Sequence, residues 1–329
     1  MNSYIKELGI FLPGKPINNT EFAAMYKGQM LKPDMIRVLF GGKYRYIAKP
    51  EMQCSDMAVN AANTFLKEED KQSIDLLIFS SASADLIEPA TANIVQKKLG
   101  LSCPVFDVKN ACNSFISAMQ IANSLIQSST YRNILIVSGE KPSDTIRFDT
   151  KSKEELKENI ASVSFGDGGT AMWISSTKDK TGIAYSKFLT MGEYWNLSTV
   201  LGGGSMYPFD PDKNFFKGET AKLIDVLKDS DAQQFAIKCF EEGPWEKDEI
   251  DLLITHQIAT HFYDRLAKTI DFPPEKIYKT FDIFANTAST SMPIALFDAI
   301  RNGKAKKGDK IMLLGVAAGV SIGVIFLKL

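Results

Sequence analysis

Three polar side chains in this sequence are of types that together carry out acyl chemistry. They are Cys112 in KNACNSF, His256 in LLITHQIAT and Asn286 in FANTAST. A cysteine can hold an acyl group as a thioester, and imidazole and carboxamide groups can hydrogen-bond an oxygen on which negative charge develops. The chain has only two histidines, His256 and His261, so any histidine chemistry depends on this one segment.

Each of the three residues also has a purely structural explanation. A helix is predicted over 113–129, and its N-terminus would favour a thiolate at Cys112, yet most free cysteines are small buried hydrophobes. His256 is equally compatible with a hydrogen-bonded structural histidine, and Asn286 with a helix cap or turn residue. His261 is predicted on the helix after His256, at the surface or at the mouth of the site.

An internal repeat indicates how these residues are positioned. Three pairs of segments match in the same order, at a nearly constant offset of about 176 residues. The pairs are SIDLLIFSSAS (73–83) with EIDLLITHQIA (249–259), VFDVKNACNS (105–114) with TFDIFANTAS (280–289), and RNILIVSG (132–139) with DKIMLLGV (309–316). The chain is therefore interpreted as two related halves, 1–178 and 179–329.

Each half has the same predicted order of elements. A buried strand is followed by a short helix, a strand ending in Phe-Asp, a turn of small residues, a helix and another apolar strand. This alternation predicts an α/β fold with parallel sheets covered on both faces, the two halves packing about a pseudo-twofold axis. Ligand sites lie beyond the carboxyl ends of such strands. The turns after Phe106-Asp107 and after Phe281-Asp282 are therefore expected to face one shared cleft.

Composition excludes several classes of protein. With 329 residues, 45% hydrophobic residues, 23% charged residues and a net charge of -1, the chain is typical of a globular protein that does not bind nucleic acid. The four cysteines contain no CxxC pair, which argues against a metal site or a disulfide framework and favours a reducing, cytoplasmic compartment. The N-terminal segment does not resemble a signal peptide.

Residues 311–327 (IMLLGVAAGVSIGVIFL) are uncharged and carry Gly315, Gly319 and Gly323 at the spacing of a membrane helix-packing motif. A membrane anchor is one interpretation. The run is at the short end of the roughly 17–25 residues that span a bilayer, and its glycines and β-branched residues favour strands. We therefore predict two buried strands joined by a Gly-rich turn, and no membrane insertion.

Taken in order along the chain, these motifs resemble the ketoacyl-ACP synthase III branch of the thiolase superfamily. DVKNACNSF resembles the nucleophile motif of that family, LLITHQIAT its histidine motif and FANTASTSMPIAL its asparagine motif. SFGDGGTAMWI resembles its Gly-Asp-Gly turn, and GVAAGVSIG its C-terminal glycine loop. The resemblance implies a thiolase-like, duplicated, layered αβαβα fold, usually as a homodimer.

The resemblance also implies roles for individual residues. Cys112 would accept an acyl group from an acyl-CoA or acyl carrier protein thioester, with the backbone N–H groups of Cys112 and Gly319 as the oxyanion hole. His256 and Asn286 would bind the carbonyl of a second thioester and stabilise its enolate, which attacks the acyl group to form a C–C bond. CoA or phosphopantetheine thioesters would be substrates, with no permanently bound cofactor and no metal.

The sequence departs from the family pattern at several positions. Met35 and Leu39 stand where housekeeping members carry a tryptophan and an arginine that hold CoA, and His261 replaces an arginine that helps hold the cofactor or carrier. Glu88, in LIEPATAN, replaces an apolar residue. It resembles the glutamate of relatives that join two acyl chains head to head, where it serves as a base, acting in the partner subunit's site. A solvated carboxylate is the alternative.

These departures favour a condensing enzyme of specialised or accessory fatty-acid or polyketide biosynthesis. The alternatives are a housekeeping enzyme that initiates fatty-acid synthesis, an acyltransferase to an alcohol or amine, and a scaffold subunit of a hetero-oligomeric synthase. The lack of a cysteine after Cys239 argues against a biosynthetic thiolase. The loop 191–216 could line a substrate tunnel or an interface, and the basic residues Arg301, Lys304, Lys306 and Lys307 could meet an acidic carrier or simply be solvated.

Overall fold

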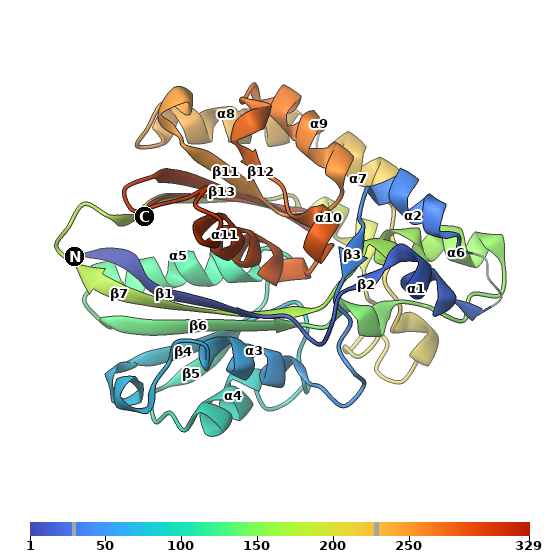
Figure 1. Cartoon of the computed structure of the whole chain (residues 1–329), viewed down its shortest axis with the longest axis horizontal. Helices are drawn as coiled ribbons and strands as arrows, with labels where there is room; N and C mark the ends of the chain where they lie inside the picture. The colour runs from blue at the N-terminus through green and yellow to red at the C-terminus, as the bar shows by residue number, and fades with distance from the viewer. Residues whose placement is uncertain (28–30, 227–229) are drawn as a thin grey trace.

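The computed structural model describes residues 1–27, 31–226 and 230–329. It contains two five-stranded sheets, and helices lie between the sheets and on their outer faces (Figure 1). This is the layered α/β architecture that the alternating strand and helix patterns predict.

The two sheets have the same plan. The first has the order β1-β7-β6-β4-β5 and the second the order β8-β14-β13-β11-β12. In each sheet the last three strands of that order are parallel, and the first two strands pair antiparallel with their neighbours. The bounds are β1 Asn2–Phe11, β4 Leu76–Ser80, β5 Val105–Val108, β6 Asn133–Glu140 and β7 Gly168–Thr177, then β8 Gly182–Thr190, β11 Leu252–Thr255, β12 Ile277–Tyr278, β13 Lys310–Ala317 and β14 Ser321–Lys328.

Pairs of helices cover each face of the sheets (Figure 1). Helices α3 (Cys54–Ala62) and α4 (Thr91–Leu99) pack on the outer face of the first sheet, and α8 (Ser230–Glu242) and α9 (Thr260–Ile270) on that of the second. Helices α5 (Ser114–Gln127) and α11 (Ser291–Arg301) lie between the sheets. Their apolar faces form the central core with the inward side chains of both sheets, which explains why α5 is apolar on several sides.

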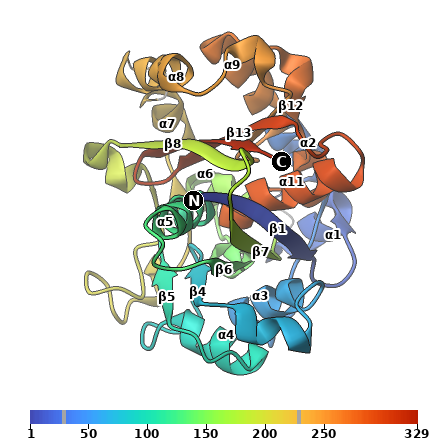
Figure 2. The ribbon, with the colours of Figure 1, turned by 90° about the vertical axis from the view of Figure 1, so that its left-hand side faces the viewer.

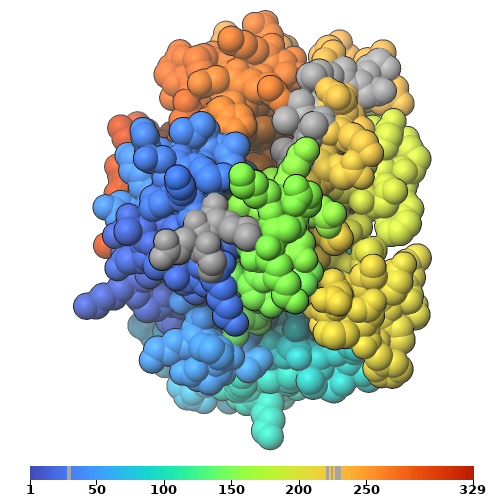
Figure 3. Space-filling view, turned by 90° about the vertical axis from the view of Figure 1, so that its right-hand side faces the viewer, coloured from blue at the N-terminus to red at the C-terminus, as the bar shows by residue number. Residues whose placement is uncertain are grey.

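A smaller group of helices lies beside the sheets, at the edge where the parallel strands end. It consists of α1 (Asn19–Ala24), α2 (Pro33–Phe40), α6 (Lys153–Asn159) and α7 (Thr220–Val226), with the short strands β2 (Ile17–Asn18), β3 (Tyr44–Arg45), β9 (Ser198–Thr199) and β10 (Lys217–Gly218). Figure 3 looks onto this edge, which is covered by the N-terminal segment (blue), by α6 (green) and by α9 above them (orange).

The Gly-rich segment 311–327 forms β13 and β14, which pair antiparallel in the middle of the second sheet, as predicted. Gly319, in the turn between them, has a φ of 124°, in the region that favours glycine. Within the described part of the chain, no helix is long and apolar enough to cross a membrane.

One predicted element is wrong. The segment containing Phe281 and Asp282 was expected to be the end of a strand, but it forms helix α10 (Phe281–Phe284), and the strand of this half is the shorter β12 before it. The reason is that side chains accept hydrogen bonds from the backbone N–H groups that a longer strand would pair with its neighbour. The N–H of Thr280 donates to Oε1 of Gln257 (2.9 Å), and that of Phe281 to the hydroxyl of Tyr263 (3.2 Å). The chain therefore leaves the sheet after Tyr278.

Candidate active site

Cys112 lies in the turn between β5 and α5, as the sequence predicts. The turn is closed by the N–H of Asn113 donating to the carbonyl of Asn110 (2.9 Å), and Asn113 directly precedes α5 without a capping hydrogen bond from its side chain. Ala111, directly before the cysteine, has a φ of 45°, which is unfavourable for a non-glycine residue and typical of functional turns. Of the four cysteines, Cys112 is the one residue that is partly exposed, and the other three are buried.

The electrostatic environment of Cys112 disfavours a thiolate. Burial of the sulfur, together with the charge of Glu140, raises the pKa of Cys112 to about 12. The resting protein therefore carries a thiol at neutral pH, whereas the position before a helix suggested a thiolate. The helix terminus does not compensate for the loss of water around the sulfur.

His256 follows β11 directly and is 2% exposed. Its Nδ1 is 2.6 Å from Oγ of Ser291, the first residue of α11. Burial lowers the pKa of His256 to about 3, so the ring is neutral at physiological pH. With Nδ1 engaged by Ser291, Nε2 is the nitrogen left for a substrate.

Asn286 lies in the turn between α10 and α11, in the second half. Its backbone bridges to the first half, because its N–H donates to the carbonyl of Ser164 (2.9 Å) and its carbonyl accepts from Gly166 (3.0 Å). The side-chain Oδ1 accepts from the N–H of Ala288 (3.0 Å), which leaves the Nδ2 donor group for another partner. Ala285, directly before it, has a φ of 60°, which parallels the strained residue before Cys112.

Hydrogen bonds tie the turn of Cys112 to the glycine loop. Nδ2 of Asn113 donates to the carbonyl of Ser321 (3.0 Å), and Nδ2 of Asn110 approaches its Oγ (3.4 Å). Ser321 starts β14, two residues after Gly319. The turns bearing Cys112 and Gly319 are therefore held together, and the oxyanion hole formed by their N–H groups stays a prediction.

The three predicted residues thus all follow strands at the same edge of the two sheets. The turn of Asn286 is joined to His256 through Ser291, and to the first half through Ser164 and Ser289. Among the described residues, no group of histidine, cysteine and acidic side chains could hold a metal ion.

Glu88 lies on the loop between β4 and α4 and is exposed in the protomer, as are its neighbours Leu86 and Ile87. It makes no hydrogen bond or ion pair to Cys112, His256 or Asn286. A buried base at this position would therefore need a second subunit to cover it, and the role of Glu88 stays a prediction.

Met35, Leu39 and His261, the three residues that depart from the expected CoA-binding pattern, lie close together on the surface. Oγ1 of Thr260, the first residue of α9, donates to the carbonyl of Phe40, the last residue of α2 (3.3 Å). The exposed His261 lies on α9, as predicted, and it lines a hollow of about 540 Å³ with Lys43 and Lys279. Met35 and Leu39 are partly exposed on α2 beside it.

The loop 191–216 divides into an anchored base and an exposed tip. Phe216 packs edge-on against Phe165 with ring centroids 4.9 Å apart, next to the strand-like bridge to Asn286. Met206 and Phe209, near the tip, are 68% and 94% exposed. The tip therefore does not line an internal tunnel of this protomer.

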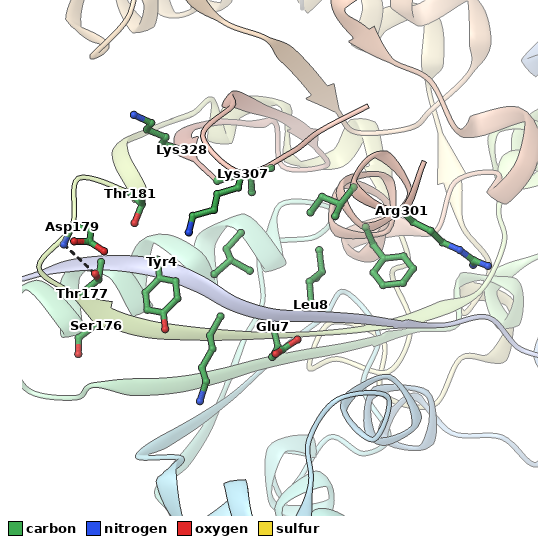
Figure 4. Close-up of a pocket in the computed structure, with 15 residues that line it drawn as sticks. Tyr4, Glu7, Leu8, Ser176, Thr177, Asp179, Thr181, Arg301, Lys307 and Lys328 are labelled. Atoms are coloured by element: carbon green, nitrogen blue, oxygen red, sulfur yellow. Dashed lines mark hydrogen bonds between the residues drawn. The ribbon is translucent and has the colours of Figure 1, made fainter. Parts of the chain in front are cut away.

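A cavity of about 720 Å³ lies at the opposite edge of the sheets (Figure 4). Both chain termini lie on this side of the molecule (Figure 2). The cavity is lined by β1, by the turn between β7 and β8, and by residues around the end of α11, including Arg301 and Lys307. These basic residues precede β13, so they lie at the amino ends of the parallel strands. A carrier bound to them would be at the wrong edge to deliver a thioester to Cys112.

Sequence reasoning missed Glu140, the last residue of β6, which is fully buried and whose charge acts on Cys112. A charged residue directly after an apolar strand, in NILIVSGE, was the available signal. The Gly-Asp-Gly turn holds a second buried carboxylate, Asp167. It accepts hydrogen bonds from Ala48 (2.7 Å) and Ser143 (2.6 Å), and burial raises its pKa to about 7.

Known proteins share both the sequence and the fold. The family model for 3-oxoacyl-[acyl-carrier-protein] synthase III matches residues 106–192, and the model for its C-terminal part matches residues 240–329. The β-ketoacyl-[acyl-carrier-protein] synthase III of Neisseria gonorrhoeae is 30% identical over 98% of both chains.

Two solved structures illustrate the likeness of fold. The 3-oxoacyl-[acyl-carrier-protein] synthase III of Aquifex aeolicus superposes with a TM-score of 0.86 at 26% identity, covering 99% of this chain and 100% of its own. A Xanthomonas campestris OleA structure gives a TM-score of 0.88 at 25% identity, covering 100% and 99%. The fold and the sequence together define a thiolase-like condensing acyltransferase. Within that class, the chain belongs to the 3-oxoacyl-[acyl-carrier-protein] synthase III family.

Proposed function

We propose that this enzyme joins two acyl thioesters in a Claisen condensation through an acyl-Cys112 intermediate, in specialised or accessory lipid or polyketide biosynthesis. The observation that carries the proposal is the pair of anchored side chains in the second half. Ser291 engages one nitrogen of His256, and Ala288 engages the oxygen of Asn286, so Nε2 and Nδ2 remain to bind a substrate oxygen.

In the first half-reaction, Sγ of Cys112 attacks the carbonyl carbon of an acyl thioester. The departing thiolate takes up the proton that the cysteine loses, so acyl-Cys112 and a free CoA or pantetheine thiol are formed. Because the resting cysteine is protonated, proton transfer must accompany the attack. Backbone N–H groups of Cys112 and Gly319 are proposed to stabilise the oxyanion.

In the second half-reaction, a second thioester either loses CO2 or gives an α-proton to a carboxylate base, for which Glu88 is the candidate, and it becomes an enolate whose oxygen is hydrogen-bonded by His256 and Asn286. Its α-carbon attacks the acyl-Cys112 carbonyl and the C–C bond forms. The cysteine sulfur leaves as a thiolate, which takes up a proton from the base or from water. A neutral histidine suits this role, because it can donate a hydrogen bond to the enolate oxygen without giving up its proton.

The surface around His261, Met35 and Leu39 supports a carrier-protein or pantetheine-only donor. None of these three side chains matches the tryptophan and arginines that hold CoA in housekeeping members. The hollow itself adds no net positive charge, because Lys43 pairs with Asp282 (3.2 Å) and Lys279 with Asp264 (3.4 Å) in its lining.

A single experiment separates the half-reactions. The enzyme is incubated with a panel of acyl-CoA and acyl-carrier thioesters, and intact mass reports the adduct. Cys112→Ser is expected to give no thioester adduct, while Asn286→Ala still forms the adduct but condenses about 10²–10³-fold more slowly. Adding a malonyl-type thioester and measuring CO2 and β-keto product distinguishes condensation from transfer to an alcohol or amine. C–C bond formation without Cys112 would exclude the proposed mechanism.

A further inference from the structure

Glu140 is a fully buried carboxylate that has no cationic partner within the described residues. The neighbouring Lys141 does not supply one, because its Nζ lies 3.4 Å from Asp144 and donates to the carbonyl of Pro50 (3.1 Å). A buried charge without a counter-ion is costly, and it persists only where hydrogen bonds replace water.

Several donors converge on this carboxylate. Oε1 accepts from the N–H of Ala82 (2.7 Å) and from the hydroxyl of Ser289, with the N–H of Ser289 farther away (3.4 Å). Oε2 accepts from the N–H (3.2 Å) and the hydroxyl (2.8 Å) of Ser83. Burial raises the pKa of the Glu140 carboxyl, and these hydrogen bonds act against that rise, because backbone N–H groups can only donate and so stabilise the ionised form.

The donors come from two segments that the proposed function uses. Ala82 and Ser83 begin the loop that leads to Glu88, and Ser289 lies three residues after Asn286 in the other half of the chain. The hydroxyl of Ser289 also contacts that of Ser138 on β6 (3.1 Å). Glu140 therefore links the turn of Asn286 to the first half of the molecule.

The same carboxylate acts on the nucleophile. Burial is the first cause of the raised pKa of the Cys112 thiol, and the charge of Glu140 adds to it. The acids Asp85, Asp144 and Asp167 act together with Glu140 on Cys54, which is buried.

We propose that Glu140 is a positioning residue, a buried carboxylate that fixes the turn of Asn286 for condensation through Ser289 and whose charge also acts on Cys112. This inference rests on the proposed function for its first part only. The state of the free thiol is measured without any substrate, so the two parts can fail separately.

Two variants separate the charge from the hydrogen bonds. Glu140→Gln removes the charge and places an amide NH2 group next to the N–H and O–H groups that donate to the carboxylate. Ser289→Ala keeps the charge and removes the link to the Asn286 turn. Both are expected to condense at least about tenfold more slowly than the wild type. A merely structural defect would slow every reaction of the protein alike.

The rate at which iodoacetamide alkylates Cys112, followed by peptide mass between pH 6 and 10, gives the second readout. Cys112 of Glu140→Gln is expected to be alkylated about tenfold faster at pH 8 for each unit by which the thiol pKa falls. The alkylation rate of Ser289→Ala is expected to stay within about twofold of that of the wild type. The opposite signs in Glu140→Gln, faster alkylation and slower condensation, are the signature of the proposal.

Clear outcomes would overturn it. Wild-type alkylation of folded Glu140→Gln at every pH removes the electrostatic part, and wild-type condensation by Ser289→Ala removes the positioning part. If Glu140→Gln does not fold, Glu140→Asp replaces it, because the shorter side chain keeps the charge but cannot reach all the donors. This variant must condense slowly while its Cys112 is alkylated at the wild-type rate. The wild-type alkylation rate must also rise without a plateau up to pH 10; a plateau near pH 8 contradicts the buried-thiol state. A wild type that forms no condensation product refutes the proposed function and leaves the alkylation results to decide the electrostatic part.

Discussion

Asn286 and His256 are each anchored at one atom and free at another. The anchoring hydrogen bonds come from Ala288 and Ser291, both in the turn and helix start that follow Asn286. Fixing the donors before substrate binds avoids reorganising them during the reaction. One short stretch of the second half therefore orients both side chains.

The neutral state of His256 leads to a prediction about stability. Its pKa is about 3 in the folded protein and about 6.5 in the unfolded chain, so between these values only the unfolded chain takes up a proton. Stability is therefore lost as pH falls below 6.5. Between pH 7 and pH 5 this amounts to about 2 kcal/mol.

Urea denaturation of the wild type and of His256→Gln at both pH values measures this contribution. The lost hydrogen bond lowers the free energy of unfolding of the variant by the same amount at both pH values. From pH 7 to pH 5, this free energy is expected to fall by about 2 kcal/mol less in the variant than in the wild type. Identical pH dependence of stability in the two proteins would mean that His256 takes up a proton in the folded state as readily as in the unfolded chain.

At the scale of elements, helix α3 approaches the first sheet unusually closely, because the facing strand residues are glycines. A Cβ at Gly169 on β7 would lie 2.3 Å from the carbonyl oxygen of Met57, and one at Gly139 on β6 would lie 1.9 Å from that of Cys54. Both obstacles are backbone atoms of the helix, which cannot rotate away. The layer spacing therefore depends on these positions.

Gly169→Ala is accordingly expected to lower the free energy of unfolding by about 3 kcal/mol, at the upper end of the range for overpacking. Gly192→Ala is the matched control, since a Cβ there meets no atom within 4 Å. Chemical denaturation of both variants measures the difference. Equal stability of the two would show that α3 can shift outward without cost.

The repeat in the sequence predicted the order of elements along each half and the edge at which Cys112, His256 and Asn286 lie, because strand ends are determined by local apolar patterns. It failed at Phe281, where Gln257 and Tyr263 capture backbone donors, a tertiary effect that no local pattern contains. Glu140 was missed for a related reason. Its importance comes from Ser289, 149 residues away, and not from its own segment.

At the scale of the whole molecule, a backbone bridge between Phe165 and Asn286 lies at the edge where the site is, and each sheet ends in strands that pair on one side only. Strand β5 is the last strand of the first sheet, and Phe106 on it is 37% exposed. Ile87, next to Glu88, is 85% exposed. Edge strands and apolar loops of this kind are usually covered, and a second copy of the chain would cover both.

We therefore predict a homodimer in which Glu88 enters the site of the partner, and subunit complementation tests this arrangement. Cys112→Ala and Glu88→Ala are each expected to abolish condensation of two acyl thioesters that lack a carboxylate to lose. When the two variants are unfolded, mixed and refolded together, half of the dimers contain one of each. In such a dimer, one site combines an intact cysteine with an intact glutamate from the other subunit, so about a quarter of the wild-type activity per protomer returns.

The complementation result depends only on which subunit supplies the carboxylate. If Glu88 served its own subunit, every site in the mixture would lack either the cysteine or the glutamate, and no activity would return. If Glu88 were a solvated carboxylate, Glu88→Ala alone would keep full activity before any mixing. Ile87→Asp adds an independent arm, since a charge at the proposed interface should yield monomers by light scattering and abolish this condensation, while Cys112 still accepts an acyl group.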